Sequence, residues 1–136
     1  MSDCIFCKIV AGEIPSYTVY EDEHTLAFLD AFPRSKGHTL VIPKKHGVTL
    51  FDYSDEEMAD LMKSVHTATK RVFDVIRPDG CNIGWNHGAA GGQAVDHLHV
   101  HIMPRWSDDE GTNMHAIVDR GEGVDVEEVA KLFKNT

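Results

Sequence analysis

The feature that most restricts this sequence is the alternation of histidine and aliphatic residues from His97 to Met103. Histidines stand at positions 97, 99 and 101, and Leu98, Val100 and Ile102 separate or follow them. Successive side chains of a β-strand point to opposite faces, so a strand here puts three imidazoles on one face and three aliphatic side chains on the other. Neighbouring imidazoles then lie about 6–7 Å apart, close enough to serve one substrate. A zinc site or a solvated edge strand also fits this pattern.

The charge balance narrows the ligands that such histidines would bind. The 136 residues include 13 Lys and Arg against 22 Asp and Glu, a formal net charge of −9. Nucleic-acid binders rely on neutralising phosphates, so we expect no polymeric nucleic acid as a partner. A small phosphate ester remains compatible, because imidazole and backbone N–H donors hold it locally. No apolar run approaches the ~20 residues of a membrane span and no signal-peptide segment is present, which predicts a cytoplasmic protein without membrane association.

Two of the three cysteines, Cys4 and Cys7, form a C-x-x-C near the N-terminus. In a reducing compartment this spacing is typical of a metal site or a redox centre, and two ordinary buried thiols also fit. No strand precedes the motif, as a thioredoxin-like site requires. Two thiolates are half of a tetrahedral zinc site, and the nine histidines are candidates for the other half. Spacing alone does not choose among them.

The order of the predicted elements indicates one α+β domain. Short strands are predicted at 17–20, 25–29, 39–42 and 81–86, followed by the histidine strand. The capping box Ser54–Glu57 predicts the start of a long amphipathic helix through Ile76, with Met62 among its core residues, and a short helix is predicted from Asp125 to about Phe133. Such an order favours a mainly antiparallel sheet with helices packed on it. The glycine-rich turn at 86–93 offers backbone N–H groups to a phosphate.

Taken together, these segments resemble the histidine triad (HIT) family of nucleotide hydrolases and transferases, in particular its Hint-like branch. His97–Met103 is similar to the family signature His-φ-His-φ-His-φ-φ, in which φ is hydrophobic. Similar segments follow the family's order along the chain: Cys4–Ile9, Glu13–Pro15, Leu26–Asp30, His38–His46 and Gly92–Gln93. The resemblance implies the HIT fold, a five-stranded mainly antiparallel sheet with two helices, and a homodimer. It implies a single domain over 1–136, with a core of about 4–108 and a C-terminal extension with a short helix over about 109–136.

The resemblance also implies an activity. Members cleave a nucleoside phosphoramidate or phosphoanhydride at the α-phosphate and release a nucleoside monophosphate, here most simply AMP. The middle histidine, His99, would attack phosphorus and form a covalent nucleotidyl-histidine, with its other nitrogen bound to the backbone carbonyl of His97. His101 would donate to the phosphate, and His38 would orient His101. The remaining family contacts are phosphate-binding Asn86, Gly92 and Gln93, ribose-binding Asp30, and purine-binding Phe6, Ile9 and Phe28.

Some family members, and their galactose-1-phosphate uridylyltransferase relatives, hold a structural zinc ion through an N-terminal C-x-x-C and two histidines. The matching residues are Cys4, Cys7, His46 and His97. A closed four-ligand site leaves no open position for water, so we expect this zinc to orient the structure and to take no part in the chemistry.

Two departures from the Hint-like pattern bear on the substrate. Ala94 stands three positions before the first triad histidine, where several Hint proteins carry a hydroxyl residue that assists the leaving amine. The segment Pro104–Asp109 resembles members that act on dinucleoside polyphosphates, with Arg105 for extra phosphates and Trp106 for a second base; both also suit surface packing. The alternatives are therefore a diadenosine polyphosphate hydrolase and a nucleotide-binding regulator with vestigial activity.

Overall fold

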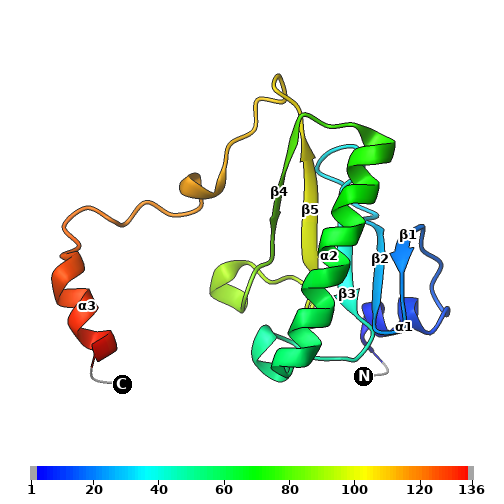
Figure 1. Cartoon of the computed structure of the whole chain (residues 1–136), viewed down its shortest axis with the longest axis horizontal. Coiled ribbons are helices and arrows are strands. Elements are labelled where there is room, and N and C mark those ends of the chain that lie inside the picture. Colours follow the sequence, from blue (N-terminus) through cyan, green and yellow to red (C-terminus); the bar gives the residue numbers. More distant parts are fainter. Residues whose placement is uncertain (1–2, 135–136) are drawn as a thin grey trace.

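The computed structural model describes residues 3–134 and shows the predicted α+β architecture, one five-stranded antiparallel sheet with a helix packed on each face (Figure 1). The strand order across the sheet is β1-β2-β3-β5-β4. The strands are β1 (Thr18–Glu21), β2 (Thr25–Leu29), β3 (Thr39–Pro43), β4 (Gly80–Gly84) and β5 (Val100–Arg105). The helices are α1 (Ile5–Val10), α2 (Asp55–Ile76) and α3 (Val126–Lys134).

Helix α2 begins where the capping box predicts. The Ser54 hydroxyl accepts the Glu57 N–H at 3.1 Å, and the Glu57 carboxylate accepts the Ser54 N–H at 2.9 Å. The helix ends at Arg77, which adopts the left-handed conformation with φ 57°. Its buried residues are Leu61, Ser64, Val65, Ala68 and Val72. The prediction of Met62 as a core residue is wrong: its side chain is 44% exposed, because it lies next to Leu61 on the solvent side of the buried stripe.

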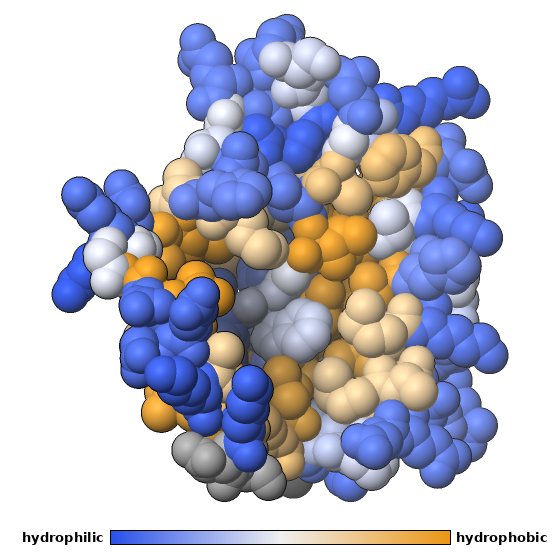
Figure 2. All heavy atoms as spheres, turned by 60° about the vertical axis from the view of Figure 1, so that its left-hand side comes forward, coloured by the Kyte–Doolittle hydropathy of each residue, from blue (hydrophilic) through white to orange (hydrophobic). Residues whose placement is uncertain are grey.

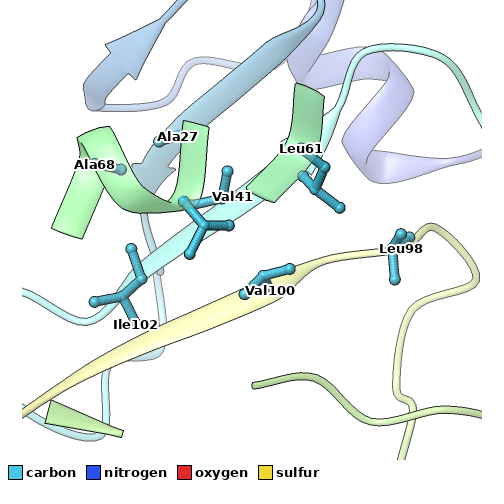
Figure 3. Packing of buried hydrophobic residues seen from close by; sticks show 8 residues of the cluster. Ala27, Val41, Leu61, Ala68, Leu98, Val100 and Ile102 are labelled. Carbon is cyan, nitrogen blue, oxygen red and sulfur yellow. The ribbon is translucent and has the colours of Figure 1, made fainter. Parts of the chain in front are cut away.

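The larger hydrophobic core lies between α2 and the sheet (Figure 3). Val41 of β3 pairs with Val100 of β5, so both side chains point to this face. Leu98 and Ile102, two residues before and after Val100, point to the same face as Val100. Their side chains are 1% and 0% exposed. The aliphatic half of the alternating pattern therefore shares one buried face, as the sequence predicts, and α2 covers that face.

The histidine half of the pattern faces α1 instead of solvent. Leu40 pairs with His101, which places both side chains on the sheet face opposite α2. Helix α1 covers this face with Phe6, which joins a second buried cluster with Leu26, Phe28, Leu40 and Ile42. His97 is fully buried and His99 is 6% exposed. The solvated edge strand is thus excluded, since β5 lies between β3 and β4.

Three local features differ from the sequence-based prediction. Helix α1 is additional to the two predicted helices, because its six residues are too few to show a helical period; the Cys4 sulfur caps it by accepting the Cys7 N–H at 3.4 Å. Strand β5 begins at Val100 and not at His97, since the Leu98 N–H donates to the carbonyl of Gly47. Strand β4 ends at Gly84, two residues before the predicted end.

The C-terminal segment leads away from the sheet and carries α3 at its end (Figure 1). Helix α3 coincides with the predicted short helix to within one residue. Every residue from 107 to 134 is exposed, and the last two residues of the predicted extension lie outside the described range. Within residues 3–134, no helix is both long enough and apolar enough to cross a lipid bilayer.

Candidate active site

The middle histidine of the row has one ring nitrogen bound to the backbone. His99 Nδ1 lies 2.7 Å from the carbonyl oxygen of His97. A carbonyl only accepts, so Nδ1 carries the proton and Nε2 keeps its lone pair. The Phe6 ring stands edge-on to this imidazole with centroids 5.2 Å apart, which limits its rotation. This hydrogen bond therefore orients the His99 ring so that, in the uncharged imidazole, Nε2 is the nitrogen with the lone pair.

A second hydrogen-bonded chain sets the tautomer of His101. The backbone N–H of Arg34 donates to His38 Nδ1 at 3.1 Å, so the proton of the His38 ring is on Nε2. This Nε2–H then donates to His101 Nδ1 at 2.9 Å. His101 is left with its own proton on Nε2, as a donor. The rings of His99 and His101 are neighbours, with centroids 5.1 Å apart, so a lone pair and a donor stand side by side.

Burial favours the uncharged forms of His38 and His101. It lowers the pKa of His38 against the smaller opposing effect of the Asp30 carboxylate. Burial also lowers the pKa of His101 to about 4, and electrostatic repulsion from the His99 and His38 rings contributes a smaller part of this shift. The Asp30 carboxylate is 3.6 Å from His38 Nε2, and its other oxygen accepts the N–H of Phe32 at 2.9 Å. Asp30 thus lies at the active-site edge, on a loop that it helps to shape.

The glycine-rich loop brings the predicted phosphate-binding residues together. Asn86 Nδ2 donates to the carbonyl of Gly92 at 3.3 Å. Gly88 and Gly92 have φ of 73° and 93°, a backbone conformation that favours glycine. Asn86 and Gly92 are exposed and precede the histidine row, as a phosphate-binding loop requires.

The side chain of Gln93 is used within this loop. Its Oε1 accepts the N–H of Gly88 at 2.9 Å. Its Nε2 donates to the carbonyls of Val48 and Val95 at 2.7 and 3.1 Å. In this structure Gln93 therefore braces the loop, and its predicted contact with a phosphate stays a prediction.

The predicted purine-binding residues lie on the same face. Phe6 and Phe28 pack edge to face with centroids 5.7 Å apart and are 6% and 3% exposed. Ile9 is only half-buried against their cluster. The two phenylalanines thus form an apolar floor, and Ile9 is the member of the set with more surface for a ligand.

The four predicted zinc ligands meet beside the histidine row. The Cys4 sulfur is 3.4 Å from His97 Nδ1, and the Cys7 sulfur is 3.3 Å from His46 Nδ1. All four ligand atoms lie within 4.8 Å of one another. His97 Nε2–H donates to the carbonyl of Pro43 at 2.8 Å, so the Nδ1 lone pair faces the sulfurs. Tetrahedral zinc with bonds of about 2.0–2.3 Å separates its ligand atoms by about 3.4–3.8 Å, and these residues fit it.

A second group with metal-binding side chains, Asp30, His38 and His101, has different chemistry. Metal binding by His38 would need a lone pair on Nε2 and therefore a proton on Nδ1. The Arg34 N–H already points at that Nδ1 and would meet a second donor. This group is therefore a proton-bearing chain and not a metal site.

Known proteins share the segments that form this site. The family profile of the HIT domain matches residues 11–108, which include His38, the glycine-rich loop and all three histidines of the row. The chain belongs to the HIT family. An uncharacterized HIT-like protein of Methanocaldococcus jannaschii is 47% identical over 96% of this chain and 98% of its own. An adenosine 5'-monophosphoramidase of Schizosaccharomyces pombe is 45% identical over 79% of this chain and 78% of its own.

Solved structures agree with this membership. A crystal structure from Streptococcus mutans has a TM-score of 0.87 at 39% identity and covers 99% of this HIT protein and 83% of its own chain. A histidine triad nucleotide-binding protein of Sulfolobus tokodaii has a TM-score of 0.75 at 43% identity. The match covers 78% of this chain and 71% of the S. tokodaii chain. The S. mutans match extends to nearly the whole chain and so includes the C-terminal segment.

The sequence-based analysis of this HIT protein gave the carbonyl that binds His99 but missed the backbone groups that set the tautomers of His97 and His38. The carbonyl of Pro43 and the N–H of Arg34 are backbone atoms, and residue type gives no signal for them. Tyr53 was also missed: its hydroxyl donates to the carbonyl of Lys45 at 2.8 Å, and its ring occupies the space beside Gly47, where a Cβ would lie 2.6 Å from a ring carbon. Tyr53 thus braces the loop next to His46. Gly47, directly after His46, was the one feature of the sequence that indicated a side chain packed closely against this loop.

Proposed function

We propose that this protein is a nucleotide hydrolase or transferase that cleaves a nucleoside phosphoramidate or phosphoanhydride at the α-phosphate and releases a nucleoside monophosphate, AMP in the simplest case. The observation that carries the proposal is the lone pair on His99 Nε2, held there by the hydrogen bond from Nδ1 to the carbonyl of His97. The names of the S. pombe relative and of a second adenosine 5'-monophosphoramidase from Saccharomyces cerevisiae, 41% identical over 79% of this chain and 66% of its own, support the substrate class.

The reaction has two displacements at phosphorus. In the first, His99 Nε2 attacks the α-phosphorus, the bond from phosphorus to the leaving amine or phosphate breaks, and the nucleotide becomes attached to His99. The leaving amine takes up a proton from solvent. In the second, water attacks the same phosphorus and loses a proton to solvent, the bond from phosphorus to His99 Nε2 breaks, and the nucleoside monophosphate and free imidazole are released. The His97 carbonyl stabilises the imidazolium that forms during attack, because Nδ1–H already donates to it.

Other residues hold the phosphate during both steps. His101 Nε2–H donates to a nonbridging oxygen, and the Arg34–His38 chain keeps its proton in place. Asn86 and the Gly92 backbone contact the other oxygens. Asp30 takes the ribose hydroxyls, and Ile9 covers the purine above the floor of Phe6 and Phe28.

We propose that Cys4, Cys7, His46 and His97 hold one structural zinc ion. Bound zinc would join α1 to the backbone that carries His97 and would have no open position for a reacting water. His97 takes part through its carbonyl and through its ring at once, which links the metal cluster to the nucleophile.

We also propose a cytoplasmic homodimer that takes a purine nucleotide as its small-molecule partner. Cys4, Cys7 and Cys81 form no disulfide among the described residues, which suits a reducing compartment. Strand β4 is at an edge of the sheet and is available for pairing with another chain.

The geometry favours a phosphoramidate over a dinucleoside polyphosphate. Arg105 was a candidate for extra phosphates, and its guanidinium donates to both oxygens of Asp109 at 2.7 and 2.9 Å, to Asn82 at 2.6 Å and to the carbonyl of Thr112. Those contacts occupy four of the five N–H donors that the guanidinium could offer to a longer phosphate chain.

The test is a panel of adenosine phosphoramidates and diadenosine polyphosphates, with products separated by chromatography. We expect AMP from the phosphoramidates at the higher kcat/KM. AMP from neither class, with the histidines intact and the protein folded, would contradict the proposed activity. Faster cleavage of the diadenosine compounds would instead assign the protein to the polyphosphate hydrolases.

A further inference from the structure

Two exposed rings stand together beside the glycine-rich loop. The rings of Phe51 and His87 meet edge to face, with centroids 5.0 Å apart and an interplanar angle of 72°. Phe51 is 80% exposed, and His87 is exposed as well. A pair that stays this open to solvent removes little apolar surface from water, so the fold gains little free energy from it.

Phe51 projects from a turn whose backbone is fixed by hydrogen bonds. The short 3₁₀ helix Leu50–Asp52 has a capping box, in which Asp52 accepts the N–H of Thr49 at 3.1 Å. The same carboxylate oxygen accepts the N–H of Val48 at 2.8 Å, and the Thr49 hydroxyl accepts the N–H of Phe51 at 3.3 Å. A ring on such a backbone loses little conformational freedom when a ligand packs on it, which favours binding.

The ring pair stands where two loops meet the histidine row. Gln93, in the glycine-rich loop, donates from Nε2 to the carbonyl of Val48 at 2.7 Å. The N–H of Leu98, within the row, donates to the carbonyl of Gly47 at 2.9 Å. The loop 46–53 is therefore tied both to the glycine-rich loop and to the start of the row, and the ring pair bridges the two loops.

The proposed reaction sets the direction in which the leaving group departs. In an in-line displacement the leaving group lies opposite the attacking atom, here His99 Nε2. His99 is 6% exposed and lies at the base of the site, so the leaving group points outward, past the residues that hold the phosphate. Asn86 is one of these in the proposed mechanism, and the Cα atom of His87 follows at about 3.8 Å. The ring pair thus lies beside the outward path of the leaving group.

The larger apolar surface of the protein lies elsewhere. A groove of about 520 Å³ runs between α2 and β4, and its lining includes Met62, Phe73 and Ile83. Figure 2, in which this side of the molecule is turned forward, shows apolar residues gathered at the centre of the face. Among the described residues, none from the loop 46–53 or from the glycine-rich loop lines that groove. The exposure of Phe51 is therefore a separate feature.

The two loops suit an uncharged aromatic group better than an anion. Neither 46–53 nor 86–93 contains a lysine or an arginine, and Asp52 stands next to Phe51. A phosphate chain on the leaving group would meet this carboxylate without a lysine or arginine from either loop. An aromatic ring finds instead two exposed rings in the edge-to-face arrangement that aromatic pairs prefer.

We infer that Phe51 and His87 form a leaving-group subsite, which selects phosphoramidates whose amine carries an aromatic ring. The inference rests on the proposed function and names the class of amine that this function leaves open. The amine's ring packs against Phe51 and adds one aromatic contact to the two-ring pair. Aromatic contacts of this kind correspond to about 2- to 12-fold in kcat/KM.

The experiment compares three adenosine 5'-phosphoramidates: the unsubstituted amide, the 2-phenylethylamide and the 2-cyclohexylethylamide. The last two have the same linker and nearly the same size, but only the first of them has an aromatic ring. The measurement is the ratio of kcat/KM for the phenyl compound to kcat/KM for the cyclohexyl compound. Comparing this ratio between enzymes cancels the intrinsic reactivity of each compound.

Phe51→Leu should lower this ratio about 2- to 12-fold relative to the wild type, and Phe51→Tyr, which keeps a ring, should retain it. The matched control is Tyr17→Leu. Tyr17 is 79% exposed, as open as Phe51, and it precedes β1 at the opposite edge of the sheet from β4. We expect the wild-type ratio in this variant.

The outcomes separate the subsite from the proposed function. An unchanged ratio in Phe51→Leu overturns the subsite, and so does an equal fall in Tyr17→Leu. Cleavage of the unsubstituted amide tests the proposed function by itself. If none of the three compounds is cleaved, the proposed function fails. The ratio of the Kd values of the two ring compounds, measured by calorimetry on wild-type and Phe51→Leu protein, then tests the ring contact with the same expected change.

Discussion

Two groups of side chains in this protein have the composition of a metal site, and backbone hydrogen bonds give them opposite chemistry. The His97 ring donates from Nε2–H to the carbonyl of Pro43, so the lone pair on its Nδ1 faces the sulfur of Cys4. The His38 ring accepts the backbone N–H of Arg34 at Nδ1, so its proton is on Nε2 and points at His101. Both groups bring their ligand atoms within 4.8 Å of one another.

The difference teaches that residue type and proximity do not identify a metal site. A carbonyl behind the ring leaves a lone pair in front, and an amide behind it leaves a proton in front. The first arrangement suits zinc, and the second supplies a hydrogen-bond donor to a phosphate. Between them lies His99, whose tautomer a third backbone group sets.

The largest expected effect comes from removing the nucleophile between the two groups. His99→Ala should lower turnover by several powers of ten, as loss of a covalent nucleophile does, while AMP binding measured by calorimetry is retained. In the wild type, rapid quenching with labelled substrate should trap a nucleotide on His99 that is more stable in alkali than in acid. Near-normal turnover of the variant, or a label on another residue, would refute the assignment.

The second effect tests the group that should bind metal. Purified protein should contain about one zinc ion per chain, and Cys4→Ser should lower the free energy of unfolding by several kcal/mol, given the strength of structural zinc sites. Catalysis should survive in part, since His99 is unchanged. Cys81→Ser is the matched control, because Cys81 lies outside the cluster. Two zinc ions per chain, or a metal-free protein of full thermal stability, would break the comparison.

The third effect tests the group that should donate a proton. His101→Ala should cost about 2.7–4 kcal/mol of transition-state stabilisation, the loss typical of one oxyanion donor. The measurement is kcat, with zinc content as the second readout. His66→Ala, on the exposed side of α2, serves as the control. A fall in zinc content together with kcat would show that His101 supports the metal cluster, contrary to the geometry.

The fourth effect isolates the backbone amide that separates the two groups. Arg34→Pro removes the N–H that His38 Nδ1 accepts, and an unsatisfied buried acceptor costs about 1–3 kcal/mol. We expect a corresponding fall in kcat and, because His38 is now free to change tautomer, weak zinc inhibition at the active site. Arg34→Ala keeps the amide and should behave as wild type. Equal losses in both variants would assign the effect to the Arg34 side chain.

The smallest effect is the pH dependence of stability. Burial lowers the pKa of His38 and His101, the latter to about 4, so an unfolded chain takes up protons below pH 6.5 that the folded chain does not. Stability should be constant above about pH 7 and fall toward pH 4, by up to about 1.4 kcal/mol per pH unit for each histidine. Urea denaturation at several pH values measures the slope. His101→Asn should reduce it, and an unchanged slope would contradict the burial argument.

Sequence patterns predicted most of the fold because they are local. The two-residue alternation at Leu98, Val100 and Ile102 predicted that these side chains share one face of the sheet, and the capping box predicted the start of α2 at Asp55. Met62 was misassigned, because a helical period defines the apolar stripe but not its width. Helix α1 was missed, since six residues show no period of their own.

The candidate site shows the same division. The identities of the three row histidines, of His38 and of the Cys4 and Cys7 pair are readable from the chain and from the family that it resembles. The tautomers of His97 and His38 are not, because they depend on which backbone group lies behind each ring. The Arg105 donors and the Gln93 amide also have partners in the structure that their residue types did not indicate.

By itself, the sequence determined the five-stranded α+β fold, the face on which the imidazoles lie and the family of the chain, since these depend on periodicity, caps and ordered motifs within short segments. Only the tertiary structure decided that the His97 ring presents a lone pair and the His38 ring a proton. It alone showed that the C-terminal segment from residue 107 to 134 leads away from the sheet and is exposed along its length. The physical reason is that a hydrogen-bond direction and an uncovered surface are relations between distant segments, whereas a residue pattern records only each segment's own preferences.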